Sequence, residues 1–232
     1  MKVAVINFSG NVGKSMVAKH LILPRLKDAE MFSVESINSD EGEGDSMRGK
    51  QFGQLQEELL MSDNPAVVDV GSSNVEDFMK LMQQFRGSHE DFDAFIVPVV
   101  KEAKQVRDTI ATIQALASMG VPAKKIRVVF NKLETDETVE DAFYPLVAYH
   151  EDSKAFMFKP KAAIYYSELY QKLRAHRMTV SDLMNDQTDY KAKLREAKSP
   201  EEKADAVAMI SMRRLAASAQ ENLDAVYAAV MR

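Results

Sequence analysis

The sequence predicts an α/β protein with a mostly parallel, twisted sheet flanked by helices and a helical C-terminal extension. Two observations carry this prediction. Over the first two thirds of the chain, short apolar runs rich in Val, Ile and Phe alternate with helical stretches, which is typical of βαβ units around a sheet buried on both faces. From Ile164 onward almost every stretch favours helix. We therefore expect an α/β domain over residues 1–175 and a helical extension over residues 176–232, packed on that domain.

Several short runs have the length and composition of buried strands. They are Val3–Asn7, Met31–Glu35, Ala66–Val70, Ala94–Val99 and Ile126–Asn131, with Ala155–Phe158 as a candidate sixth. Helices are expected between them, near residues 14–27, 46–61, 74–85 and 103–118. The stretch Ser73–Glu76 has the pattern of a capping box that opens the third of these helices, and Gly120–Pro122 marks the end of the fourth.

The C-terminal helix has a clear predicted start. Ser199 is a capping serine, Pro200 suits the first turn and Glu202 lies three residues after the cap. One face of the helix is apolar, at steps of three and four residues: Met212, Leu215, Ala219, Leu223, Val226 and Val230. We interpret it as a helix packed on its own domain. A dimer contact and a membrane-surface helix are the alternatives, and the mixed charge of the polar face argues against the membrane.

The composition indicates a packed globular chain and excludes several kinds of chemistry. Hydrophobic residues make up 46% of the chain and charged residues 28%, as in ordinary globular domains. The sequence has no cysteine, which excludes disulfides, thiolate metal sites and thiol catalysis. Its four histidines lack the spacing of transition-metal ligands. The net charge of −5 gives the chain as a whole no attraction to nucleic acid.

The sequence carries no sign of a membrane or secretory segment. It contains no apolar run of about 18 residues, the length that a spanning helix needs. The N-terminal stretch Met1–Asn7 turns polar too early for a signal peptide. We therefore expect a cytoplasmic protein without a membrane span.

The first strand runs directly into the stretch Ser9–Ser15, which reads SGNVGKS, and a helix is expected to begin there. Small residues let backbone N–H groups turn toward an anion, and the helix N-terminus adds a positive dipole. A lysine such as Lys14 can reach the outer phosphates of a nucleotide, and the hydroxyl of Ser15 can bind Mg²⁺. The strict G-x-x-x-x-G-K-[ST] pattern fails because Phe8 stands at the first glycine position, so the prediction rests on the strand-loop-helix context.

This loop resembles that of the ParA/MinD ATPases, K-G-G-x-G-K-[ST]. Gly10 matches a family glycine, and Asn11 replaces the other, as the non-glycine residue that best tolerates left-handed geometry. Ser9 stands where the family has its signature lysine, which reaches the partner's nucleotide in an ATP-bridged dimer. Its absence puts hydrolysis activated in trans in doubt and leaves the phosphate grip within one chain intact. The run Asn7–Ser15 resembles the plasmid-stability StbB variant, which departs in the same way.

The resemblance implies a nucleotide site with ATP or ADP and Mg²⁺ as cofactors. Its nucleotide-binding candidates are Ser9, Gly10, Asn11, Val12, Gly13, Lys14, Ser15, Met16 and Asn131. Asp69 ends the third predicted strand and resembles the acidic residue that holds Mg²⁺ with Ser15, usually through water. Asn131 resembles the strand-terminal residue that contacts adenine, since an amide offers a donor and an acceptor. Asp69 by itself could be an ordinary strand end, but its order and spacing after the loop favour the functional interpretation. For Asn131, an ordinary turn asparagine that ends a strand remains the alternative.

The catalytic candidates are Lys14, Glu35 and Asp40. Glu35 and Asp40 lie after the second strand, where the family has its first switch and an Asp that orients the attacking water. Neither matches the usual D-x-D spacing, and the same stretch reads equally as a surface loop.

Basic residues gather between Lys159 and Arg177, with tyrosines interleaved and Glu168 as their acidic counterpart. Some ParA/MinD relatives bind DNA nonspecifically through basic residues late in the chain. A solvated helix face is the more economical interpretation.

The sequence therefore favours a nucleotide switch for plasmid stability or partition. The resemblance implies ATP-dependent homodimerisation, a plasmid-encoded DNA-binding adaptor, a weak ATPase activity and a role in conjugative transfer. A P-loop small-molecule kinase or ATP-dependent ligase shares the same sheet and loop and is the alternative. A module that holds nucleotide without hydrolysing it is the third interpretation, which Ser9 keeps open.

Overall fold

The computed structural model describes residues 1–34 and 45–231. Its centre is a six-stranded, entirely parallel sheet in the order β2-β3-β1-β4-β5-β6. The strands are β1 (Lys2–Val5), β2 (Glu30–Val34), β3 (Ala66–Val70), β4 (Ala94–Val99), β5 (Ile126–Leu133) and β6 (Ala163–Tyr165). The predicted α/β class and the first five strands are confirmed: β3 and β4 have the predicted ends, and the ends of the other three differ by at most two residues.

The predicted sixth strand is wrong. Ala155–Phe158 contributes only an isolated bridge between Arg127 and Met157, and the sixth strand is Ala163–Tyr165 beside β5. The run is apolar because Phe156 is buried in the core and its ring contacts His150 at 4.7 Å between centroids. The side chains of this segment pack in the core beside the sheet, while its backbone forms no strand.

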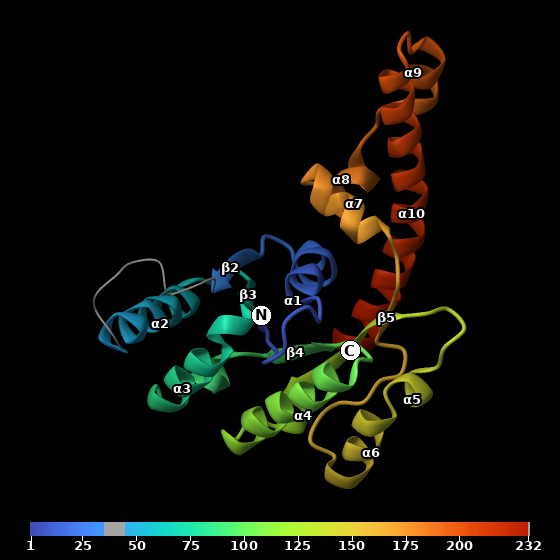
Figure 1. Ribbon diagram of the computed structural model, residues 1–232. Helices are drawn as coiled ribbons and strands as arrows, with labels where there is room; N and C mark the ends of the chain where they lie inside the picture. Colours follow the sequence, from blue (N-terminus) through green and yellow to red (C-terminus); the bar gives the residue numbers. More distant parts are fainter. Residues whose placement is uncertain (35–44, 232) are drawn as a thin grey trace.

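Helices cover both faces of the sheet (Figure 1). The longer ones are α2 (Asp45–Met61), α3 (Val75–Gln84), α4 (Ala103–Ser118), α6 (Tyr144–Ser153), α7 (Leu169–His176) and α10 (Pro200–Met231). The shorter ones are α1 (Lys14–Met16), α5 (Val139–Ala142), α8 (Val180–Asn185) and α9 (Tyr190–Glu196). The helix expected over 14–27 continues from α1 as a π-helix, η1 (Val17–Ile22), and a 3₁₀ turn, η2 (Leu23–Arg25).

Alternate side chains of each strand pack into two separate hydrophobic cores, one on each face of the sheet. Ala4 and Ile6 of the first strand segment belong to the core under α2, α3 and α4. Val3 and Val5 belong to the core formed with η1, α7, α8 and α10. A sheet buried on both faces in this way explains why the strands read as continuous apolar runs.

The two predicted capping boxes have different outcomes. At α10, Glu202 N donates to Ser199 Oγ at 3.1 Å and Ser199 N donates to Glu202 Oε2 at 3.4 Å, which confirms the box. The box at Ser73–Glu76 is wrong, because Asn74 is the N-cap of α3 and no side chain caps that helix. The Asn74 amide donates instead to Val34 O at 2.9 Å, so a tertiary contact replaces the local cap.

Helix α10 extends away from the sheet and carries α8 and α9 along its outer half, as Figure 1 shows in orange and red. Its inner half packs against β5, β6 and η1. The apolar face predicted from the sequence is buried at Met212, Leu223 and Val226, so this face contacts the chain's own elements. Over the described ranges, no helix is long and apolar enough to cross a membrane.

Candidate functional site

The loop between β1 and α1 has the backbone shape of an anion cradle. Asn11 and Gly13 both adopt left-handed conformations, with φ of 62° and 91°. The left-handed Asn11 fits the prediction that asparagine can stand in for glycine there. The first N–H groups of a helix have no intrahelical acceptor, and no side chain caps α1 at its start at Lys14. These donors and the helix dipole point to a site for a negatively charged group.

Lys14 is buried and lies over its own loop. Its Nζ donates to Ser9 O at 2.7 Å and to Asn7 O at 3.0 Å. Burial lowers the pKa of Lys14 to about 8, and the nearby Asp69 carboxylate partly opposes this shift. Lys14 does not line the neighbouring cavity. A phosphate contact therefore requires the ammonium group to exchange a loop carbonyl for the anion, which a partly desolvated cation favours.

Asn7, which sequence reasoning did not single out, shapes the loop from below. Its buried amide donates to Thr109 Oγ1 at 2.7 Å and to Pro98 O at 2.9 Å. Its Oδ1 accepts from Ser9 N at 2.8 Å, and Phe8 N donates to Thr112 Oγ1 at 3.0 Å. The loop is thereby fastened to α4 and β4. The available sequence signal was a polar residue ending an apolar strand, paired with two threonines three apart in a distant helix.

The remaining loop residues contribute mainly through their backbone. The Ser9 and Val12 side chains are buried, with 1% and 0% of their surface exposed. A Cβ on Gly10 would lie 3.5 Å from Ser72 Oγ, so the loop packs against the segment after β3. Met16 is half-buried and lines a cavity beside the loop.

The structure brings Ser15 and Asp69 to the same edge of the sheet. Asp69 is paired in register with Val5 on β1 and is 4% exposed, and Ser15 lies exposed in the first turn of α1. Among residues 1–34 and 45–231, no group of three or more His, Cys, Asp or Glu side chains could hold a metal. A carboxylate and a hydroxyl suit Mg²⁺ when waters and phosphate oxygens supply the other ligands.

Asn131 lies against the loop Ser9–Ser15, which we call the phosphate loop. Its Nδ2 donates to Val12 O at 2.9 Å, and its Oδ1 accepts from Lys132 N at 3.0 Å. The remaining amide hydrogen and oxygen lone pair of Asn131 are the capacity left for a base edge. A Cβ on Gly13 would lie only 2.3 Å from Asn131 Nδ2, so glycine is required at this close approach.

A cavity of about 330 Å³ opens beside the loop. Gly13, Met16 and Asn131 line this cavity, together with Lys132 and Tyr165. Its size falls within the range of small-ligand sites. The phosphate loop and a nucleoside-sized space are therefore contiguous.

Glu35 and Asp40 lie outside the described residues. The strand that leads to them ends at Val34, whose carbonyl accepts from Gly71 N at 3.1 Å and from Asn74 Nδ2 at 2.9 Å. The chain before the predicted switch is thus joined to the segment that follows Asp69.

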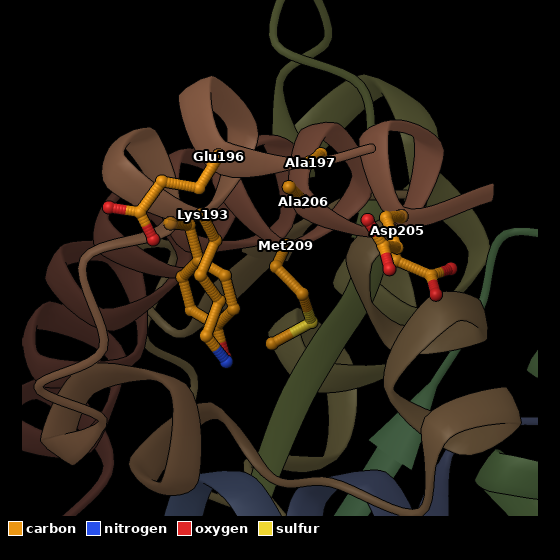
Figure 2. A pocket seen from close by; sticks show the side chains of 8 residues that line it. Lys193, Glu196, Ala197, Asp205, Ala206 and Met209 are labelled. Atoms are coloured by element: carbon orange, nitrogen blue, oxygen red, sulfur yellow. The ribbon is translucent and has the colours of Figure 1, made fainter. Parts of the chain in front are cut away.

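A separate cavity of about 350 Å³ lies between α9 and α10 (Figure 2). Its side chains include Lys193 and Glu196 from α9 and Asp205 and Met209 from α10. No residue of the phosphate loop lines it, so it is not part of the candidate site.

No protein-family model and no curated protein matches this sequence, but the fold matches solved structures. These include the MinC:MinD cell division complex and MinD from Aquifex aeolicus, each 14% identical, with TM-scores of 0.53 and 0.52. The alignments cover 92% of this chain in both cases, and 94% and 95% of those chains. An ATP complex of a McdA variant from Cyanothece is 13% identical, with a TM-score of 0.51 and 96% of both chains covered. The chain therefore has the same fold as these MinD and McdA structures.

Proposed function

We propose that this protein is an ATP-binding and slowly ATP-hydrolysing switch for plasmid stability or partition. One observation carries the proposal. A loop with left-handed Asn11 and Gly13 leads into an uncapped helix whose buried Lys14 lies close to Asp69. This is the arrangement that a nucleotide polyphosphate with Mg²⁺ requires.

In this proposal the loop backbone from Ser9 to Met16 holds the phosphates. Lys14 leaves the carbonyls of Asn7 and Ser9 and binds the outer phosphates. Ser15 and Asp69 hold Mg²⁺, the second through water, and the ion would neutralise charge on the phosphate oxygens. The structural neighbour McdA was solved with ATP, which supports ATP as the nucleotide.

The base and ribose would occupy the cavity beside Met16. Asn131 offers its remaining donor and acceptor to the base edge. The exposed ring of Tyr165 lies in the same cavity wall and offers a face for stacking. Glu35 or Asp40 would orient the attacking water for hydrolysis.

The switch itself would be ATP-dependent dimerisation read by a DNA-binding adaptor. The StbB-like loop sequence supports plasmid stability, with conjugative transfer as a further role, and a cytoplasmic location fits that role. The MinD neighbour forms a complex with MinC, which supports a partner protein for this fold. Direct nonspecific DNA contact through the basic residues between Lys159 and Arg177 belongs to the same proposal.

Ser9 limits what one subunit of the expected dimer can contribute to its partner's nucleotide site. Its side chain is buried and its N–H is bonded to Asn7, so this position cannot reach a partner's nucleotide. Hydrolysis should therefore be slow and should not depend on a residue 9 contact across the dimer. A hydrolysis-deficient nucleotide-binding module is the limiting case.

The deciding experiment measures molar mass by light scattering with Mg-ADP, Mg-ATP and Mg-AMPPNP, after calorimetry has established nucleotide binding. We expect a monomer with ADP and a dimer with ATP or AMPPNP. Slow phosphate release without an added acceptor would support a switch over a small-molecule kinase or ligase. A flat calorimetric titration would contradict nucleotide binding, and an unchanged molar mass with bound AMPPNP would contradict the switch.

A further inference from the structure

A second cavity, of about 410 Å³, lies beside the nucleotide cavity. One wall comes from the helix that follows the phosphate loop, with Ser15, Met16 and Lys19, and the other from α7 and its end, with Arg174 and Arg177. Met16, Tyr170 and Arg174 line both cavities. The two spaces are therefore neighbours that share a wall.

The charged groups around this second cavity are mostly cationic. Lys19, Arg174 and Arg177 line it, and none of the three has an ion-pair partner in the described part of the chain. Glu168 of the neighbouring cavity is paired with Lys172 at 3.3 Å. Unpaired cations gathered around a concave space attract anions.

Asp182 of α8 is the acidic residue that acts on this region, and its carboxylate already accepts a hydrogen bond within its own helix cap. Asp182 Oδ2 accepts from Thr179 N at 2.7 Å, and Asp182 N donates to Thr179 Oγ1 at 3.1 Å, as the capping box of α8. Asp182 acts on His20 as a nearby negative charge, but burial and Lys19 dominate and lower the pKa of His20 to about 4. The His20 side chain that lines the cavity is therefore neutral at pH 7.

Uncharged residues also line this second cavity. His20 Nδ1 accepts from Val180 N at 3.4 Å, and the His20 and Tyr170 rings lie 5.8 Å apart. Burial raises the pKa of Tyr170 to about 12, so its hydroxyl remains a donor. Leu173 adds an apolar surface. Exposed cations, a neutral hydroxyl donor and an apolar surface around one cavity are the features of a site for a small organic anion.

We propose that this second cavity binds a phosphate-bearing small molecule at the same time as the nucleotide. Arginine guanidinium groups bind phosphate through two parallel hydrogen bonds, and Arg174 and Arg177 are three residues apart at the end of α7. Lys19 supplies a third cation from the opposite wall. The site goes beyond the proposed switch and does not require ATP hydrolysis.

The shared wall makes the second site sensitive to the first. A ligand held by Arg174 contacts the element that also bounds the nucleotide cavity. Occupancy of either cavity should therefore change affinity in the other, and the coupling is reciprocal.

Calorimetry tests the proposal with inorganic pyrophosphate as the probe, in excess Mg²⁺. The protein is first saturated with Mg-AMPPNP, so that the phosphate loop is filled. We expect one pyrophosphate site per chain, with at least tenfold weaker binding in the double variant Arg174→Gln, Arg177→Gln. The matched control Arg86→Gln replaces an exposed arginine that does not line this cavity and should bind as the unmodified protein does. Circular dichroism and urea unfolding confirm that each variant is folded.

Three results would overturn the proposal. Failure of pyrophosphate to bind the AMPPNP-saturated protein, together with a loss of AMPPNP affinity in the double variant, would make the cavity a part of the nucleotide site. In nucleotide-free protein, loss of pyrophosphate binding in Lys14→Ala but not in the double variant would assign the probe to the phosphate loop. Binding of a DNA duplex through Arg174 and Arg177, without pyrophosphate binding, would identify a nucleic-acid contact. The proposed ATP switch is tested separately, by AMPPNP binding and by the molar mass with bound nucleotide.

Discussion

The Arg25 guanidinium joins the end of the helix after the phosphate loop to Asp224 on the C-terminal helix. Its Nη2 lies 2.7 Å from Asp224 Oδ1, and its Nε donates to the same oxygen at 2.9 Å. Its Nη1 donates to His20 O at 2.8 Å and Leu21 O at 3.0 Å, so it also terminates the π-helix η1. Residues far apart in the sequence thereby become one structural connection between the candidate site and α10.

Replacing Arg25 should weaken the folded state more than replacing Asp224. Arg25→Ala removes two bonds to helix carbonyls as well as the ion pair, and should lower the free energy of unfolding by about 2 kcal/mol. Asp224→Asn should cost only about 0.5 kcal/mol, because the Asp224 side chain is 57% exposed. Urea unfolding of both single variants and the double variant measures the coupling. Equal effects of Arg25→Ala and the exposed control Arg86→Ala would refute the structural role.

Lys14→Ala should abolish detectable ATP binding by calorimetry, with at least a 100-fold loss of affinity. The lysine provides the charged contact to the outer phosphates in the proposed site. Lys27→Ala, at an exposed position outside the site, is the matched control and should bind ATP normally. Unchanged ATP affinity in Lys14→Ala would disprove the assignment of the loop.

The same lysine predicts a pH dependence of ATP binding. Burial lowers the pKa of Lys14 to about 8 in the nucleotide-free protein, so its ammonium group loses its proton as the pH rises through that value. Because the phosphates favour the charged amine, ATP affinity should fall between pH 8 and pH 9.5. Lys14→Arg keeps its charge over that range and should show a smaller fall. A flat affinity profile in the unmodified protein would contradict this expectation.

Gly13→Ala should damage the loop through two separate effects. Gly13 has a φ of 91°, and a Cβ there would lie 2.3 Å from Asn131 Nδ2. Strain and the lost Asn131 bond should together cost about 2–3 kcal/mol. Gly87→Ala is the matched control, because its φ is 93° and a Cβ would meet nothing within 4 Å. It should cost about 1 kcal/mol, and equal costs would show that the Asn131 contact is unimportant.

His20 should make the folded state less stable as the pH falls from about 6.5 to about 4. Its pKa is lowered to about 4 by burial first and by Lys19 second, so the unfolded chain takes up the proton before the folded one. The stability that the lowered pKa of His20 contributes to the folded state is fully present above pH 6.5. It decreases as the pH falls through this window and is lost below pH 4, and the total loss is at most about 3 kcal/mol. Urea unfolding at pH 7 and pH 4.5 measures the loss.

The variant His20→Gln should reduce the acid-induced loss of stability over that window. His176→Gln, at an exposed position, controls for the removal of an imidazole and should leave the loss unchanged. If His20→Gln and His176→Gln behave alike, the acid sensitivity arises elsewhere in the protein.

Local patterns in the sequence determined the α/β class, five of the strands, the phosphate-loop turn and the start of α10. Each depends on neighbouring residues: the apolar runs, the Gly13-Lys14-Ser15 spacing at a strand end, and the Ser199 capping box. Short-range steric and hydrogen-bonding preferences are sufficient for such features.

Only the tertiary structure decided the rest, because those features depend on contacts between distant segments. Backbone pairing with β5 made Ala163–Tyr165 the sixth strand, although Phe156 belongs to the more apolar run. Asn74 bonds Val34 in place of capping its own helix. The cavity that joins Lys19 to Arg174 exists because α7 folds back over the helix after the phosphate loop, and no local pattern in the chain specifies that approach.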